Sequence, residues 1–146
     1  MDKKIQSFIE GQKNLTFCTA VDNIPQCASC FYAFIEEGDF VVFKSDNKST
    51  HISNALINDK VAGTIIPDLD KTGTIKGIQF TGKFIVPTGD LLEQAKKKYY
   101  AKYPFSLVIP GDLWVVELIT IKMTDNTLGF GKKLAWEKTG NKAIKQ

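Results

Sequence analysis

The polar residues between positions 44 and 51 have the types and the spacing of an anion-binding site. Ser49 stands where a helix is expected to begin, because Ile52, Ala55 and Leu56 follow it at helical spacing. A helix start leaves backbone N–H groups free and carries a partial positive charge, and both attract a phosphate. An ordinary capped junction between a strand and a helix would show the same pattern. The candidate ligands are Lys44, Ser45, Lys48, Ser49, Thr50 and His51.

Three cysteines, Cys18, Cys27 and Cys30, are the other residues with reactive side chains. Cys27 and Cys30 have the spacing of a C-x-x-C motif, but the residues after them predict a strand, on which positions three apart point to opposite faces. A zinc site that adds His51 lacks a second closely spaced pair of ligands. An odd number of cysteines also argues against a disulfide framework. We therefore expect small buried hydrophobic residues and no metal site.

The charge of the chain limits its partners. All nineteen basic residues are lysines, and the net charge is +3. Arginine makes the commonest base-specific contact to DNA, so its absence argues against sequence-specific binding of nucleic acid. The lysine run at 96–98 is expected to be a solvated helix face. Any bound phosphate must therefore rely on lysines, hydroxyls and backbone amides.

The length and hydropathy of the chain predict a single domain that does not enter a membrane. Its 146 residues are enough to bury one core. No apolar run approaches the roughly 20 residues that cross a bilayer, and no apolar segment follows the first lysines as it would in a signal peptide. We expect one domain over residues 1–146, with a loose tail from about 138 to 146, in the cytoplasm.

Hydrophobic periodicity predicts three helices and six or seven strands. The expected strands cover residues 15–21, 27–35, 40–43, 61–66, 75–86, 114–123 and a last stretch that ends near 136. The expected helices cover residues 5–11, the segment after 49, and residues 90–103, and a turn is expected at 23–25. On the long strand, Gln79 lies on the face opposite Ile78 and Phe80. This set of elements favours a small antiparallel barrel.

The order of these elements resembles the FMN-binding split barrel of the pyridoxamine 5'-phosphate oxidase-like superfamily, over nearly the whole chain. The most specific parts of the resemblance are residues 75–82 (IKGIQFTG) and 121–136 (IKMTDNTLGFGKKLAW). Both look like the signature of one uncharacterised bacterial branch, the YhbP-like family. The resemblance implies a mainly β fold with helices, a six- to seven-stranded antiparallel split β-barrel.

The resemblance also implies where a cofactor binds. In that superfamily, the loop after the third strand and the start of the next helix hold the FMN phosphate, here with Thr50 and His51 in place of an Arg-Lys pair. The flavin ring lies against the preceding strand, mostly on backbone groups, and Gln79 is the candidate polar residue near it. Members usually form homodimers with the flavin site at the interface. The residues implied to bind the cofactor are Lys44, Ser45, Ser49, Thr50, His51, Ser29, Cys30 and Gln79.

The implied function is an FMN-dependent oxidoreductase that acts on a small-molecule redox substrate, with the flavin carrying the redox step. The substrate stays open, and no catalytic residue follows from the sequence. The alternative is a non-catalytic protein of the same fold that binds flavin or haem, with His51 as the one imidazole for haem iron. The resemblance implies that the true oxidases recognise pyridoxine phosphate through basic and His residues near the C-terminus. The tail after residue 137 has neither Arg nor His, so oxidation of pyridoxine phosphate itself is not expected.

Overall fold

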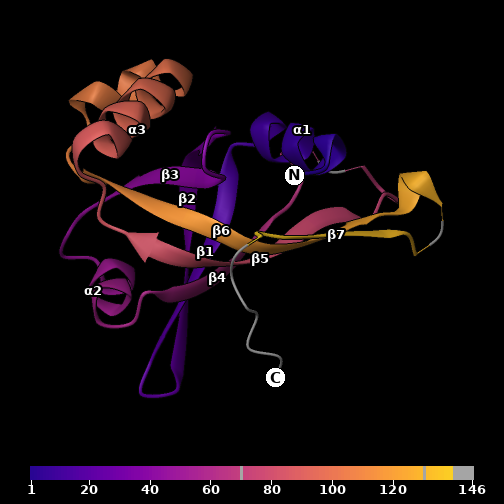
Figure 1. The fold of residues 1–146 in the computed structure, drawn as a ribbon, viewed down its shortest axis with the longest axis horizontal. Helices are drawn as coiled ribbons and strands as arrows, with labels where there is room; N and C mark the ends of the chain where they lie inside the picture. Colours follow the sequence, from indigo (N-terminus) through magenta and orange to yellow (C-terminus); the bar gives the residue numbers. More distant parts are fainter. Residues whose placement is uncertain (70, 130, 140–146) are drawn as a thin grey trace.

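The computed structural model describes residues 1–69, 71–129 and 131–139, without the side chain of Leu128. The helices are α1 (Lys3–Gly11), α2 (Thr50–Ile57) and α3 (Gly89–Lys102), with 3₁₀ turns η1 (Pro104–Val108) and η2 (Asn126–Leu128). The strands are β1 (Asn14–Val21), β2 (Ile24–Ile35), β3 (Phe40–Ser45), β4 (Lys60–Ile65), β5 (Lys76–Ile85), β6 (Asp112–Asp125) and β7 (Lys133–Glu137). This order agrees with the order predicted from periodicity (Figure 1). No helix among the described residues is long and apolar enough to cross a membrane.

The seven strands form one antiparallel sheet that closes on itself. Their order is β3-β2-β1-β4-β5-β6-β7, and an additional pairing of β3 with β6 joins the first six strands into a barrel. β7 stays outside this ring and pairs with the second half of β6. The predicted mainly β fold, an antiparallel split barrel with helices, is confirmed. Closure leaves few free strand edges, which protects the backbone groups of a small domain.

The barrel is split because β6 changes one of its partners, and β2 loses one of its partners, along their length. β6 pairs with β3 over residues 112–117 and with β7 over residues 120–124. β2 pairs with β3 only over residues 32–35. The rest of β2, residues 24–31, has β1 on one side and no strand on the other within the described residues. We call the open side of this stretch the β2 edge.

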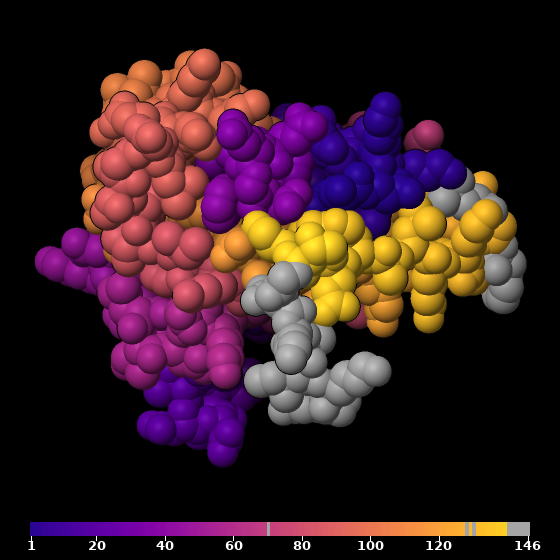
Figure 2. All heavy atoms as spheres, in the orientation of Figure 1, coloured from indigo at the N-terminus to yellow at the C-terminus, as the bar shows by residue number. Residues whose placement is uncertain are grey.

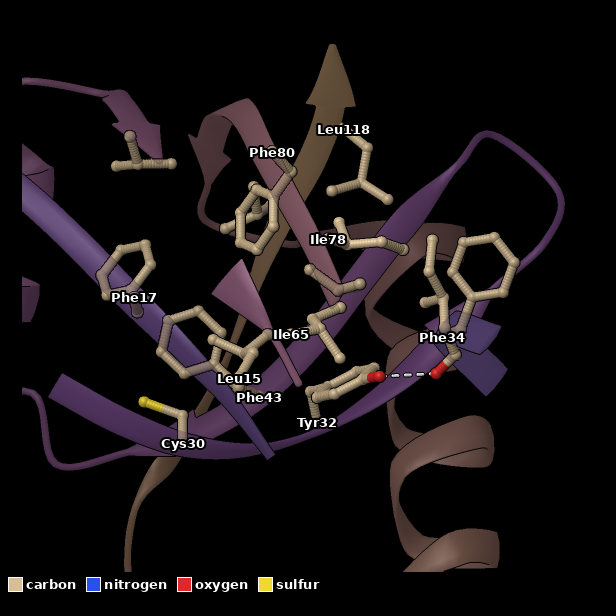
Figure 3. Close-up of a cluster of buried hydrophobic side chains, with 14 of the residues drawn as sticks. Leu15, Phe17, Cys30, Tyr32, Phe34, Phe43, Ile65, Ile78, Phe80 and Leu118 are labelled. Atoms are coloured by element: carbon tan, nitrogen blue, oxygen red, sulfur yellow. Dashed lines mark hydrogen bonds between the residues drawn. The ribbon is translucent and has the colours of Figure 1, made fainter. Parts of the chain in front are cut away.

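Alternating side chains of the strands fill the barrel interior. The buried side chains that meet there include those of Leu15, Phe17, Phe43, Ile65 and Phe80 (Figure 3). Tyr32 is also fully buried there, and its hydroxyl donates a hydrogen bond to the backbone oxygen of Ile9 at 2.5 Å. This bond satisfies the one polar atom of a large core side chain and ties α1 to the barrel.

α3 packs against the outer face of the barrel where β2, β3 and β6 meet. Its Ala95 and Tyr99 join Val42 and Val115 in a second buried cluster. Val42 and Phe43 belong to different clusters because successive strand residues point to opposite faces. Residues 96–98 of α3 are exposed, as predicted for a solvated face.

The turn between β1 and β2 differs from the predicted one. Asp22 and Asn23 form it, with φ angles of +52° and +62°, and residues 24 and 25 already belong to β2. Two consecutive positive φ angles give the tight hairpin turn that matches strand twist, and Asp and Asn adopt them more readily than most residues. The tip of this hairpin projects beyond α2 (Figures 1 and 2). The turn also sets the register, in which Cys18 stands opposite Cys27.

Lys138, where the loose tail was expected to begin, is held against the barrel. Its N–H donates to the backbone oxygen of Ile119 at 2.8 Å, and its Nζ lies 2.8 Å from Glu117 Oε1. The rest of the expected tail, residues 140–146, lies outside the described residues.

Candidate cofactor site

Ser45, Ser49 and His51 form a connected polar group between the end of β3 and the start of α2, which we call the hydroxyl cluster. The Oγ of Ser45 lies 2.7 Å from Nε2 of His51 and 3.3 Å from Oγ of Ser49. The Oγ of Ser49 lies 3.4 Å from Nε2 of His51 and donates to the backbone oxygen of Asp46 at 2.7 Å. All three side chains are half-buried. The structure thus brings together three of the residues that the sequence predicts at this site.

The start of α2 adds backbone donors to the hydroxyl cluster. Ser49 is the N-cap residue, as predicted, but its hydroxyl makes no capping hydrogen bond. The first N–H groups of a helix have no acceptor inside the helix, and those of His51 and Ile52, which an N-cap side chain usually accepts from, lack that cap here. The first turn also contains no acidic residue that would neutralise the helix dipole. An anion bound here would take the place of the missing cap.

His51 contributes an uncharged imidazole to the hydroxyl cluster. Its ring meets the ring of Phe17 edge-on, with 6.0 Å between ring centroids. Partial burial disfavours the charged form and lowers the pKa of His51 below its ordinary value of 6.5. At neutral pH, the cluster therefore offers hydroxyls, backbone N–H groups and a neutral ring, but no formal charge of its own.

The ammonium group of Lys44 lies away from the hydroxyl cluster. It donates to the backbone oxygen of Ser106 at 2.8 Å and to the hydroxyl of Tyr100 at 3.2 Å, and it lies 5.1 Å from the centroid of that tyrosine ring. Lys44 and Ser45 are neighbours on a strand, so their side chains point to opposite faces. Lys48 is exposed beside the cluster, and its N–H donates to Asp46 Oδ1 at 2.8 Å.

The β2 edge presents backbone hydrogen-bonding groups. Tyr32 N–H donates to the backbone oxygen of Lys13, on the β1 side, at 2.9 Å. Backbone groups alternate in direction along a strand, so those of Cys27, Ser29 and Phe31 point the other way, toward the β2 edge. Ser29 also has an exposed side chain. The predicted stretch for a flavin ring therefore does have free backbone donors and acceptors.

Cys30 marks the point where the β2 edge meets the hydroxyl cluster. The ladder between β2 and β3 ends with Tyr32 opposite Phe43, and Cys30 and Ser45 lie two positions beyond this last pair on their strands. The side chain of Cys30 turns into the barrel interior, where burial raises the pKa of its thiol to about 11. Its direction therefore does not support the predicted contact with a cofactor at the edge.

Gln79 lies on the outer face of the sheet, in the same row as Ser29. The pairing runs from Ser29 to Thr16, from Thr16 to Thr64, and from Thr64 to Gln79. Three strand spacings, about 14 Å, thus separate Gln79 from Ser29. Gln79 is exposed and lines a hollow of about 680 Å³, together with Thr64 and Cys18. The hydroxyl cluster is not part of this hollow, so the predicted site residues fall in separate places.

The structure also pairs two cysteines that the sequence reading left apart. The Sγ atoms of Cys18 and Cys27 lie 3.1 Å from each other on the outer face of the hairpin, with Cys27 exposed. The expectation of three buried cysteines is therefore wrong for Cys27. Cys30 points into the barrel, so these thiols do not form a common zinc site with His51. A two-residue turn at positions 22 and 23 places residues 18 and 27 opposite each other, so a correctly placed turn predicts the pair.

Several solved structures share this fold. A haem-binding protein from Mycobacterium smegmatis has a TM-score of 0.78 at 14% identity; the match covers 90% of this chain and 55% of that protein, so the chain spans about half its length. A FAD-binding protein from Mesorhizobium loti has a TM-score of 0.64 at 14% identity, and the match covers 83% of this chain and 91% of that protein. A third match is a Clostridium acetobutylicum protein related to general stress protein 26, of the pyridoxinephosphate oxidase family. It has a TM-score of 0.65 at 12% identity, and the match covers 94% of this chain and 96% of that protein. The protein thus has the split-barrel fold that these structures share.

Sequence similarity then defines its family. No family model matches the chain. A UPF0306 protein of Photorhabdus laumondii is 37% identical over 134 residues, covering 92% of this chain and 94% of that protein. A UPF0306 protein of Yersinia pestis biovar Antiqua is also 37% identical over 134 residues, covering 92% of this chain and 91% of that protein. The chain belongs to the UPF0306 family.

Proposed function

We propose that this protein is an FMN-binding oxidoreductase that acts on a small-molecule redox substrate. The observation that carries the proposal is the position of the hydroxyl cluster, at the start of α2 and at one end of the β2 edge. The hydroxyl cluster suits a phosphate, and the β2 edge suits the edge of a planar heterocycle. Similar structures that are described as FAD-binding and as pyridoxinephosphate oxidase relatives support a flavin.

The residues have distinct roles in this proposal. The hydroxyls of Ser45 and Ser49 and the N–H groups of Thr50 and His51 hold the phosphate. The exposed ammonium of Lys48 supplies the charge that Lys44 does not bring to the cluster. Backbone groups of the β2 edge orient the ring, and bound FMN supplies the redox chemistry.

The proposal extends to partners and place. We expect a homodimer with the flavin site at the interface, which light scattering would detect as a mass twice that of the chain. A contribution from Gln79 to the ring environment requires the ring to extend across β1 and β4, or a second copy to bring its Gln79. We further propose the YhbP-like branch, a cytoplasmic location, and no nucleic-acid or membrane partner.

A comparison of FMN with riboflavin tests the proposal, because the two differ only by the phosphate. We expect FMN to bind at least about tenfold more tightly, since two hydrogen bonds to a charged group contribute more than about 1.4 kcal/mol. Quenching of flavin fluorescence measures both affinities. Equal affinities would remove the hydroxyl cluster from the site, and no binding of either flavin would reject the proposal.

A non-catalytic protein that binds flavin or haem is the second candidate. It is favoured by the similarity to a haem-binding protein and by the neutral imidazole of His51, the form that ligates iron. In the present structure, however, Nε2 of His51 contacts Ser45. Titration with haemin separates the candidates: a Soret shift that is lost in His51→Ala would support haem, and its absence would leave flavin.

A further inference from the structure

Cys18 and Cys27 face each other across the hairpin formed by β1 and β2. Their Sγ atoms are 3.1 Å apart, and the two residues are direct partners in the antiparallel ladder. A two-residue turn and a continuous ladder hold them there, so the contact does not depend on a flexible loop. The two thiols are therefore positioned next to each other by the fold itself.

The pair occupies the type of ladder position at which side chains come closest. The bond from Tyr32 N–H to the oxygen of Lys13 marks residues 13 and 32 as a hydrogen-bonded pair, and alternate pairs along a ladder are of the other type. Cys18 and Cys27 belong to that other type, in which Cα atoms are about 4.5 Å apart. Disulfides span about 4.4 to 6.8 Å between Cα atoms, so a bond fits here near the short limit. A disulfide at an exposed position is more readily reduced than a buried one, as a reversible site requires.

The two thiols differ in their surroundings. Cys27 is exposed, so a reagent in solution reaches it directly. Cys18 is half-buried and lines two hollows on the outer face, of about 680 and 790 Å³. Burial, together with the neighbouring Cys27, raises the pKa of Cys18 to about 11. Cys27 is therefore the residue that reacts first, and Cys18 is the one placed to react second.

We propose that Cys18 and Cys27 form a reversible dithiol–disulfide site that reacts with low-molecular-weight disulfides. The Cys27 thiolate attacks one sulfur of the disulfide, whose S–S bond breaks and releases one thiolate. Cys18 then loses its proton to solvent and attacks the Cys27 sulfur, which releases the second thiolate. The two protein thiols are oxidised to one disulfide, and the reagent is reduced to two thiols.

The bond is not needed to hold the hairpin together. It closes a loop of fewer than ten residues between strands that already pair on both sides of it. In the chain-entropy model, a cross-link around so short a loop contributes less than one around a long loop. The ladder keeps the two thiols in place whether or not the bond forms, as a reversible site requires.

The test uses the reduced full-length protein without added flavin, so its outcome is independent of the proposed function. Glutathione disulfide is the probe, and thiols are then alkylated in denaturant and counted by mass spectrometry. We expect one free thiol of the three to remain, and dithiothreitol to restore all three. Cleavage at Asp22, which lies between the two cysteines, should leave the two peptides joined.

Single substitutions decide which thiols react. Cys30→Ser is the matched control and should lose both of its remaining thiols. Cys18→Ser should accumulate glutathione on Cys27, because the facing thiol that would displace it is gone and Cys30 is buried in the barrel interior. Three retained thiols in the wild-type protein, or glutathione that stays on Cys27 while Cys18 is free, would overturn the proposal.

Discussion

In the proposed site, the hydroxyl cluster binds an anion through dipoles and hydrogen bonds, because it carries no formal charge. The single imidazole is held in a setting that lowers its pKa, and the ammonium of Lys44 lies with Tyr100 on the other face of β3. A site of this kind selects by the direction of its donors, because the strand end and the helix start hold the hydroxyls and the N–H groups in fixed orientations. Phosphate recognition here should therefore depend on the serines.

The two serines give a direct test of this role. Replacing both, as Ser45→Ala with Ser49→Ala, should raise the Kd for FMN by roughly 100-fold, because each of the two hydrogen bonds to a charged group contributes about 1.5 kcal/mol. Fluorescence titration measures the change. Ser53→Ala is the matched control, since Ser53 is an exposed serine one turn further along α2. An unchanged affinity in the double variant would move the phosphate elsewhere.

His51 should make the stability of the fold depend on pH in a defined window. Burial lowers its pKa in the folded state, whereas the unfolded chain has an ordinary histidine pKa of about 6.5. The unfolded state therefore binds the proton more readily, so the stability is complete above about pH 6.5 and falls as the pH drops below it. Urea unfolding at pH 7.5 and 5.5 should show a larger loss for the wild type than for His51→Gln. Equal losses in both proteins would contradict this assignment, because the chain contains one histidine.

At the scale of the elements, Gly63 lets β4 pass closely between β1 and β5. A Cβ at this position would overlap the backbone oxygen of Thr16 and the ring of Phe80. Gly63→Val should therefore lower the free energy of unfolding by about 3 kcal/mol, the upper end of the usual cost of overpacking. Urea denaturation measures this change. Gly11→Ala is the control, since nothing lies near its added Cβ, and a similar loss in both variants would contradict the packing argument.

The elements themselves follow from local patterns in the sequence. Alternation over β1 and β5 and helical spacing after Ser49 each reflect a face buried in the core, so they are visible without knowledge of the partners. The turn was misplaced because Pro25 is a strong turn residue, whereas Asp22 and Asn23 form the actual turn. Pro25 is tolerated in β2 because its nitrogen faces the open β2 edge, where it interrupts no ladder bond.

The candidate site was predictable only in its local part. Ser45, Ser49 and His51 are close in sequence, and one strand–helix junction brings them together. The prediction placed Lys44 in the site as well, but its ammonium lies with Tyr100 and Ser106, on the opposite face of β3 from Ser45. The β2 edge was not predictable, because it depends on where β3 leaves β2 for β6. Pairing between distant segments decides that point, and no local pattern records it.

At the scale of the whole molecule, β2 links the two reactive features. Its residues 24–31 provide the open edge beside the hydroxyl cluster, and its outward-facing Cys27 carries half of the thiol pair. The open edge exists because the barrel closes through β3 and β6 and leaves this part of β2 with one neighbour, whereas the thiol pair follows from the register of the β1–β2 hairpin. The split in the barrel is thus the structural origin of the proposed site.

The absorption spectrum of the protein purified without added ligand, and again after addition of FMN, tests the central claim most directly. We expect the visible bands of a protein-bound flavin, either at once or after FMN is added and free ligand is removed. A Soret band would instead support the haem-binding alternative. A colourless protein that retains no added FMN would contradict the account.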